Sequence, residues 1–353
     1  MTDIKNLSLA ELEETITSWG EPKYRAKQVF EWLHKHLAQD TSKMTNLPKK
    51  LREKLDGSFY FPALEMVDVL YAESDETRKF LFKLPDSNVI ESVLMKYEHG
   101  YSVCISSQVG CRMGCSFCAS TIGGKIRDLT AGEMLEQIYS ISRWLAGENA
   151  GERVSNVVVM GTGEPFDNFE NFCRFYERIT DPDGLNISGR NITVSTCGLT
   201  EKIYELAEKN YTLTLAISLH APNDIVRQQI MPVARGYSIS EIMKACDHYF
   251  NKTGRRITFE YSLIDGVNDS DECAAELAHL LKGRNCHVNL IPVNPVKERK
   301  YARSDAQRVT LFKNILEKNG INATIRRGMG KDIDAACGQL RRSYIENMKK
   351  TDD

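Results

Sequence analysis

The sequence predicts an α/β chain, a partial (β/α)6 barrel preceded by a small N-terminal helical domain and a short β extension. Three patterns lead to this prediction. Helical periodicity fills the first sixty residues, and alternation typical of strands fills residues 61–98. After that, six apolar strand-like runs alternate with helical patterns, which indicates a parallel sheet with right-handed crossovers. Six units favour an incomplete barrel, with its chemistry at the carboxyl ends of the strands.

The N-terminal domain is predicted to hold three helices. Ser8 and Glu11 form a capping-box pattern, and apolar residues at helical spacing follow up to Gly20. A second helix is expected to open at Pro22, and a third covers residues 47–55. The expected domains are a helical accessory domain, a β-rich extension, a barrel core with its C-terminal segment, and a tail: 1–58, 59–98, 99–345 and 346–353.

The six barrel strands are expected at Tyr101–Ser107, Val154–Met160, Asn191–Thr196, Thr212–Leu219, Arg256–Ile264 and His287–Ile291. Helical patterns between them include Ala131–Leu145, Leu199–Lys209, Ile239–Phe250 and Asp271–Leu281. In the extension, Lys79–Lys83 and Val89–Met95 alternate as strands do.

Composition points to a cytoplasmic globular protein. The 353 residues are 42% hydrophobic and 27% charged, without a signal peptide or an apolar run long enough to span a membrane. Nothing in the sequence suggests more than a monomer. In a reducing compartment, ten cysteines are better explained as metal, redox or core residues than as disulfides.

Charge is unevenly distributed along the chain. The net charge is −2, but residues 296–350 hold 14 Lys/Arg against 6 Asp/Glu. A basic C-terminal segment on an acidic body suits contact with phosphates. A solvated surface explains the same pattern, so charge alone does not decide.

Cys111, Cys115 and Cys118 form a C-x3-C-x2-C motif after the first barrel strand. Three thiolates on one loop can hold three corners of a [4Fe-4S] cluster and leave one iron without a protein ligand. Structural zinc would require a fourth ligand, and no second paired motif is present. The motif resembles that of the radical S-adenosylmethionine (SAM) superfamily, in which the open iron binds SAM.

Polar residues recur at the ends of the later strands. Gly163 and Glu164 follow the second strand; Phe166 replaces the third glycine of a dinucleotide fingerprint, so that interpretation fails. The segment instead resembles the GGE-type motif, whose glutamate takes the SAM ammonium group, although a structural turn would also explain it. The other strand-end residues are Ser195, Ser218, Leu219, His220 and Asn294. A lone His220 would more often be a core histidine, but its place at a strand end favours ligand contact.

Two further cysteines stand out. Cys337 lies among small residues near cations, as a nucleophilic thiolate does, and Cys104 lies seven residues before the cluster motif. A core role would explain either one. Together with the motifs above, however, they complete a pattern similar to the radical SAM RNA methyltransferases of the RlmN/Cfr family. The matching strings are CISSQVGCRMGCSFC (104–118), MGTGEP (160–165), SLHAPND (218–224), NLIPVNP (289–295) and DIDAACGQL (332–340).

The resemblance implies a mechanism that uses two SAM molecules per turnover. Cys337 accepts a methyl group from the first, and a 5'-deoxyadenosyl radical from the second activates that methyl for addition to an adenine carbon. Cys104 then resolves the covalent RNA adduct by forming a disulfide with Cys337, and Glu91 is the proton acceptor. The implied SAM contacts are Gly163, Glu164, Ser195, Ser218, Leu219, His220 and Asn294.

Within the family, Pro165 after the glutamate and the strings SLHAPND and NLIPVNP resemble the RlmN branch. That branch methylates carbon 2 of an adenosine in 23S rRNA, at the peptidyl-transferase centre, and of an adenosine beside the anticodon of some tRNAs. The alternative is Cfr-like methylation of carbon 8, which confers antibiotic resistance. An electron donor such as flavodoxin or ferredoxin is implied. Two other classes remain open, a radical SAM activase or sulfur-insertion enzyme and a redox sensor, but neither requires both Cys104 and Cys337.

Overall fold

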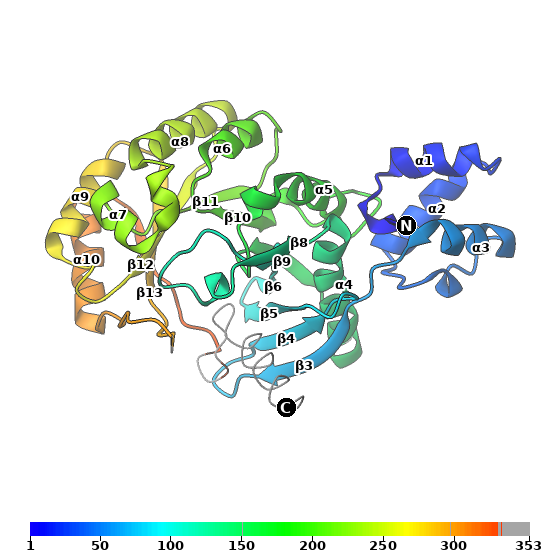
Figure 1. The fold of residues 1–353 in the computed structure, drawn as a ribbon, viewed down its shortest axis with the longest axis horizontal. Helices are drawn as coiled ribbons and strands as arrows, with labels where there is room; N and C mark the ends of the chain where they lie inside the picture. Colours follow the sequence, from blue (N-terminus) through cyan, green and yellow to red (C-terminus); the bar gives the residue numbers. More distant parts are fainter. Residues whose placement is uncertain (150, 297, 331–332, 334–353) are drawn as a thin grey trace.

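A ten-stranded mixed sheet forms the centre of the molecule (Figure 1). The computed structural model describes residues 1–149, 151–296, 298–330 and 333. The strands are ordered β14-β13-β12-β11-β10-β9-β6-β5-β4-β3, so consecutive barrel strands lie side by side. This order confirms the α/β class and the incomplete barrel.

The six barrel strands occur where the sequence predicts them and are all mutually parallel. They are β6 (Gly100–Cys104), β9 (Val154–Val159), β10 (Ile192–Thr196), β11 (Thr214–Ser218), β12 (Ile257–Leu263) and β13 (Cys286–Pro292). A seventh parallel strand, β14 (Ala323–Ile325), pairs with β13 and was not predicted. Its three residues are too few for a periodic signal.

The β extension consists of β3 (Glu65–Tyr71), β4 (Arg78–Lys83) and β5 (Val89–Tyr97), which confirms both predicted strands. Its strands are antiparallel, and β5 pairs with β6 of the barrel, so the sheet runs without a break across residues 98–99. One apolar core includes Phe80 and Ile90 of the extension together with barrel residues. The extension therefore forms one wall of the open barrel.

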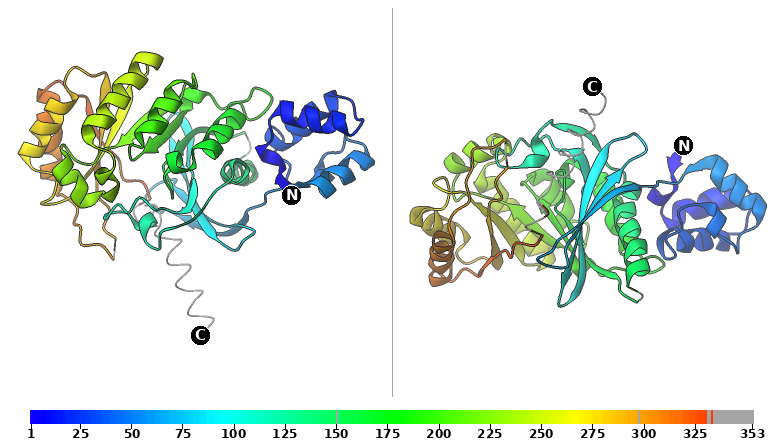
Figure 2. Two further views of the ribbon diagram at one scale, coloured as in Figure 1. Left: turned by 45° about the horizontal axis from the view of Figure 1, so that its top comes forward. Right: turned by 90° about the horizontal axis from the view of Figure 1, so that it is seen from below.

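Helices cover the outer side of the barrel strands, as the two further views also show (Figures 1 and 2). They are α4 (Ala131–Glu148), α5 (Phe169–Ile179), α6 (Thr200–Ala207), α7 (Asp224–Ile230), α8 (Ile239–Thr253), α9 (Asp271–Leu281) and α10 (Ala306–Lys318). A 3-10 turn of the barrel, η3 (Ala119–Thr121), precedes α4, and three more lie between the later helices: η4 (Pro165–Asn168), η5 (Gly189–Asn191) and η6 (Pro232–Arg235). Within the described ranges, no helix is both long and apolar enough to cross a bilayer.

The N-terminal helices form a group at one side of the molecule, with an apolar cluster of their own (Figure 1). They are α1 (Leu9–Ser18), α2 (Tyr24–His34) and α3 (Lys49–Ser58), with η1 (Ile4–Asn6), η2 (Thr41–Lys43) and a short pair β1 (Thr2–Asp3) and β2 (Phe59–Tyr60). The predicted capping box of Ser8 and Glu11 is present. The third helix begins two residues later than predicted, because Leu47 precedes Pro48 and a residue before proline avoids helical geometry.

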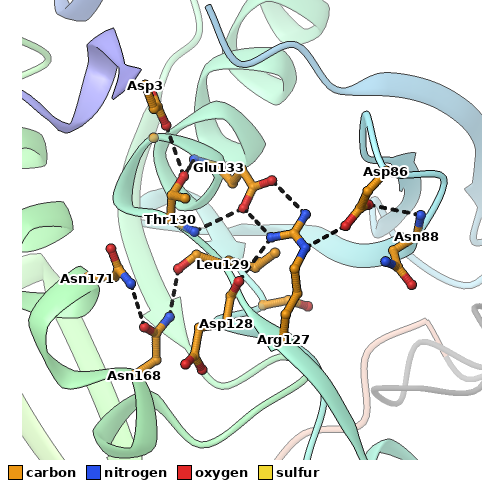
Figure 3. Close-up of polar contacts among 12 residues, drawn as sticks. Asp3, Asp86, Asn88, Arg127, Asp128, Leu129, Thr130, Glu133, Asn168 and Asn171 are labelled. Carbon is orange, nitrogen blue, oxygen red and sulfur yellow. Dashed lines mark hydrogen bonds and ion pairs between the residues drawn. The ribbon is translucent and has the colours of Figure 1, made fainter. Parts of the chain in front are cut away.

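Polar contacts join this N-terminal group to the barrel (Figure 3). The Thr130 hydroxyl, which caps α4, donates to the Asp3 carboxylate at 2.9 Å. Glu133 of the same capping box accepts two bonds from Arg127, at 2.7 and 2.8 Å, and Arg127 also donates to Asp86 in the turn before β5. Nearby, the buried ammonium of Lys5 contacts the buried carboxylate of Glu136. These contacts fix the N-terminal segment against α4.

Candidate active site

A cavity of 540 Å³ lies at the carboxyl ends of the barrel strands. Its lining comes from the cluster loop, from the turns after β9, β10, β11 and β13, and from one face of β5 and β6. Because parallel strands end at the same edge, residues far apart in sequence meet here. Of the predicted site residues, the lining includes Cys104, Cys111, Cys115, Cys118, Gly163, Glu164, Ser195, Ser218, His220 and Asn294.

The three motif cysteines lie on a loop that a two-stranded ribbon closes at its base. β7 (Gln108–Gly110) pairs antiparallel with β8 (Lys125–Asp128), and the N–H of Cys111 donates to the carbonyl of Gly124 at 3.2 Å. Gly110 has φ +80°, and a Cβ there would lie 1.9 Å from the Gly124 oxygen. Only glycine permits this closure, which directs the loop over the cavity.

The environment of the three thiols fits a metal cluster. Burial raises the pKa of Cys111 to about 12, and burial likewise raises the pKa of Cys115. Such thiols would stay protonated without a strong cation, and bound iron supplies one. Across the described residues, no three Cys, His, Asp or Glu side chains converge on one point as ligands of a single metal ion do. A cubane does not require that convergence, because each thiolate binds a different iron.

Glu164 places a buried carboxylate at the cavity wall. Its two oxygens accept the backbone N–H groups of Phe166, at 3.0 Å, and Cys197, at 2.8 Å. Burial raises the pKa of Glu164, and the described part of the chain brings no Lys or Arg into ion-pair range of it. A carboxylate held in this way is suited to a ligand ammonium group, which would satisfy its remaining lone pairs.

The glycine before Glu164 is required by close packing. Gly163 has φ +116°, and a Cβ would lie 2.7 Å from the side chains of Ser107 and Gln108. Gln108 also accepts the N–H of Glu164 at 2.9 Å through its amide oxygen. The base of the cluster loop is thus bonded directly to the turn after β9.

His220 presents one ring nitrogen to the cavity. Its Nδ1 accepts the N–H of Ser262 at 2.9 Å, so the ring proton is on Nε2. Burial lowers the pKa of His220 to about 3, and the neutral ring is therefore a hydrogen-bond donor at physiological pH. Ser195 and Ser218 lie beside it at the neighbouring strand ends, with their hydroxyls 3.0 Å apart.

β5 and β6 form one side of the cavity. Val93 and Met95 line the cavity, and Val93 lies directly opposite Cys104 in the antiparallel ladder. Glu91 lies on the same face two residues earlier, but it is buried against Lys79 and is not part of the cavity lining. The structure thus places Cys104 in the site and Glu91 next to it.

Two other predicted residues are not in the lining that the structure describes. The side chain of Leu219 is fully buried and does not line it, so any SAM contact there is through the backbone. Cys337 lies outside the described residues. The chain leading toward it, from Arg326 to Gly330, does line the cavity.

Sequence reasoning missed several lining residues. Glu260 lies in the middle of β12, nine-tenths or more buried, and accepts a bond from Asn289 at 2.8 Å. A carboxylate between two aromatic residues of a strand, Phe259 and Tyr261, is a signal that sequence analysis can detect. Cys197 and Arg303 also line the cavity, without a motif that would have marked them, and so does Met113, an unassigned position inside the cluster motif.

Comparisons with known proteins identify the family of the chain. Residues 2–60 match the Ribosomal RNA large subunit methyltransferase N-terminal domain, and residues 105–278 match the Radical SAM superfamily. Curated relatives named "Probable dual-specificity RNA methyltransferase RlmN" come from Lachnoclostridium phytofermentans and Lachnospira eligens. The first is 58% identical over 98% of this chain and 95% of its own; the second is 57% identical over 100% and 99%.

The fold matches as well. A solved radical SAM methyltransferase from Sphaerobacter thermophilus is 47% identical with a TM-score of 0.91, covering 96% of this chain and 99% of that one. Sequence identity this high over nearly the whole chain extends through the N-terminal helices, the extension and the barrel. The chain belongs to the RlmN family of radical SAM RNA methyltransferases.

Proposed function

We propose that the enzyme methylates carbon 2 of adenosine in 23S rRNA and in some tRNAs. The observation that carries the proposal is one cavity lined by the three cluster-motif thiols, the polar strand-end residues and the thiol of Cys104. An activase or sulfur-insertion enzyme has no use for Cys104 together with Cys337. The sequence around Glu164, His220 and Asn294 resembles the RlmN branch, which favours methylation of adenine carbon 2 over carbon 8.

The chemistry requires a methyl carrier because carbon 2 of adenine is electron-poor and SAM's methyl group is electrophilic. We assign the carrier role to Cys337, whose thiolate takes the methyl group from one SAM molecule by displacement. When bound, the [4Fe-4S] cluster supplies the electron that converts a second SAM molecule to methionine and a 5'-deoxyadenosyl radical. The residues of the chain bind, orient and shield these reactants.

The proposed SAM-binding site lies at the carboxyl ends of the strands. The Glu164 carboxylate would take the ammonium group, and the His220 Nε2–H and the hydroxyls of Ser195 and Ser218 would donate to ligand oxygens. Asn294 and the backbone of Gly163 complete the lining. Leu219 would contribute only its backbone, since its side chain is buried away from the cavity.

Cys104 and Glu91 are proposed to act after the methyl carbon has bonded to the RNA. From the cavity face of β6, the Cys104 thiol would attack Cys337 and release the methylated RNA, leaving a disulfide that an external thiol must reduce. Glu91, on the same sheet face, would take the proton from the ring carbon. Its supporting observation is position only, since it lies two residues from the cavity-lining Val93.

RNA contact is proposed for the helical accessory domain and the basic C-terminal segment, residues 296–350, with the target base unstacked to enter the barrel. Arg299 is an exception within that segment. It donates to the hydroxyl of Thr121 at 2.9 Å and to the carbonyl of Cys118 at 3.4 Å, and so supports the cluster loop. Because Arg303 lines the cavity, charge reversal of Lys300 alone is the cleaner test, and unchanged RNA affinity in a filter-binding assay would refute this part.

The function is tested by reconstituting the cluster anaerobically and adding SAM, a reductant and either a 23S rRNA fragment or tRNA. We expect 2-methyladenosine with 5'-deoxyadenosine, identified by mass spectrometry against both methyladenosine standards. Replacement of Cys104 by Ala should trap a covalent protein–RNA adduct. Appearance of 8-methyladenosine would instead establish the Cfr-like reaction. A flavodoxin or ferredoxin as reductant, a monomeric state and a cytoplasmic location are further proposals.

A further inference from the structure

The turn-rich segment after β11 contains a fully buried arginine. Arg227 of α7 has no exposed surface, and all three of its nitrogens donate to backbone carbonyls. Nη2 bonds the carbonyl of Cys197 at 2.6 Å, Nη1 that of Tyr237 at 3.0 Å, and Nε that of Leu219 at 3.1 Å. One guanidinium thus joins the ends of β10 and β11 to the segment that leads into α8.

Two of these carbonyls belong to residues that position the proposed SAM contacts Glu164 and His220. The Cys197 N–H donates to Glu164, so a bond to the Cys197 carbonyl orients that residue from its other side. The Leu219 carbonyl precedes His220, whose φ of 57° is in the left-handed region that non-glycine residues avoid. A position this costly persists only when its surroundings hold it, and Arg227 holds one side of it.

The same segment supports the cluster loop. The carbonyl of Ile230, at the end of α7, accepts the backbone N–H of Ser116 at 2.8 Å and its hydroxyl at 3.0 Å. Ser116 lies between two of the motif cysteines. A Cβ on Gly114 would meet the ring of Pro232 at 3.4 Å, so the loop packs closely on the turn after α7.

Arg227 also carries a charge that lacks a close counterion. In the described part of the chain, no carboxylate lies within 4.0 Å of its guanidinium, and Asp224, one turn earlier, accepts the N–H of Ile239 instead. A buried cation without a counterion lowers the stability of the fold, and an arginine cannot avoid that cost by losing its proton. An anionic group bound in the neighbouring cavity would offset that cost. A cluster held by three thiolates is such an anion, and it becomes more negative on reduction.

We propose that Arg227 is a positioning residue for the radical SAM reaction: it clamps the strand ends that hold SAM, and its charge favours the reduced cluster. The proposal rests on the proposed function, in that it needs SAM and the cluster to occupy this cavity. It assigns both tasks to one side chain that touches neither reactant.

Two variants separate the clamp from the charge, with Arg235→Gln as the control because Arg235 is an exposed arginine on the adjacent turn. Arg227→Gln removes the charge and most of the hydrogen bonds to the three carbonyls. Arg227→Lys keeps the charge but cannot bond three carbonyls at once. Each reconstituted protein is assayed for iron and sulfide, for SAM affinity by equilibrium dialysis, and for cluster midpoint potential by spectroelectrochemistry with electron paramagnetic resonance.

We expect Arg227→Gln to lose at least tenfold in SAM affinity and to lower the midpoint potential by about 59 mV, a tenfold shift in the one-electron equilibrium. Arg227→Lys should lose SAM affinity but keep the potential, and Arg235→Gln should change neither. Wild-type SAM affinity in Arg227→Lys would overturn the clamp, and a potential as low as that of the Gln variant would overturn the charge. If Arg227→Gln fails to fold, the Lys variant still decides the clamp by its SAM affinity, and a midpoint potential about 59 mV below that of the wild type would overturn the charge. Failure of the wild-type protein to bind cluster or SAM would instead refute the proposed function.

Discussion

The ammonium of Lys79 lies 3.3 Å from a carboxylate oxygen of Glu91, and both side chains are buried in the sheet wall beside the cavity. A buried ion pair is costly to break from one side, because the remaining charge is left without its partner. This pair therefore links the proposed proton acceptor to the stability of the wall on which Cys104 lies.

Replacing Glu91 with Gln should abolish methylation and destabilise the fold by about 1.5–3 kcal/mol, since the buried ammonium of Lys79 loses a charged partner. The double variant Glu91→Gln/Lys79→Met removes both charges and should regain most of that stability while remaining inactive. Chemical denaturation and a single-turnover methylation assay measure the two effects. A double variant that methylates RNA at the wild-type rate would show that Glu91 is not the proton acceptor.

Much of this architecture was predictable because its signals are local. Strand runs such as Val154–Val159 are apolar and bounded by turns, and the capping boxes at Ser8 and Thr130 mark helix starts directly. The motif cysteines share one loop, so their spacing alone brings them together. β14 was missed because three residues carry no periodicity.

The rest depends on tertiary contacts that sequence spacing cannot convey. Nothing in the string around Arg227 shows that its nitrogens meet carbonyls of three separate segments. Likewise, Glu91 is an ordinary strand glutamate until the register of β4 and β5 places Lys79 beside it. Leu219 was assigned to SAM as part of a motif, and only the fold shows that its side chain points into the core.

Glu164→Gln should weaken SAM binding by about 10- to 100-fold, because a charge-assisted hydrogen bond contributes about 1.5–3 kcal/mol. The amide is nearly isosteric, so the cavity shape is retained. Equilibrium dialysis on reconstituted protein measures the affinity. Glu260→Gln is the matched control, another buried carboxylate in the same lining, and should change SAM affinity much less. Equal losses in both variants would contradict the assignment of the ammonium group to Glu164.

Gly163→Ala should reduce SAM affinity and cost about 1–3 kcal/mol of stability, because the left-handed backbone is strained and the methyl group meets Ser107 and Gln108. The control is Gly147→Ala on α4, where a Cβ meets nothing within 4 Å. That change should be neutral or stabilise the helix by about 0.5–1 kcal/mol. Thermal unfolding and SAM titration of both variants test the contrast, which fails if Gly163→Ala binds SAM normally.

His34 should make the N-terminal helices sensitive to acid. Burial lowers the pKa of His34 to about 3, and its Nδ1 lies 2.8 Å from the Tyr139 hydroxyl. Below pH 6.5, the ordinary pKa of histidine, the unfolded chain binds a proton on His34 that the native state does not bind. Stability is therefore lost as pH falls from 6.5 toward 3, by at most about 1.4 kcal/mol per pH unit.

The check is urea unfolding between pH 7.5 and 5, followed by fluorescence of Trp19 and Trp32, which belong to these helices. His34→Gln keeps an acceptor for Tyr139 but does not titrate, so its unfolding free energy should fall less steeply with acid than that of the wild type. Parallel slopes in the two proteins would mean that His34 is not the group responsible.

The central claim is that one distant thiol carries the methyl group into a cavity built for SAM and a three-thiolate cluster. The most direct measurement compares wild-type enzyme and Cys337→Ala, both purified and reconstituted without oxygen, with methyl-labelled SAM and an RNA substrate. We expect the wild type to yield labelled 2-methyladenosine together with 5'-deoxyadenosine, and the variant to cleave SAM without labelling RNA. Unchanged RNA labelling by Cys337→Ala, or wild-type protein that contains no iron and sulfide, would contradict the account.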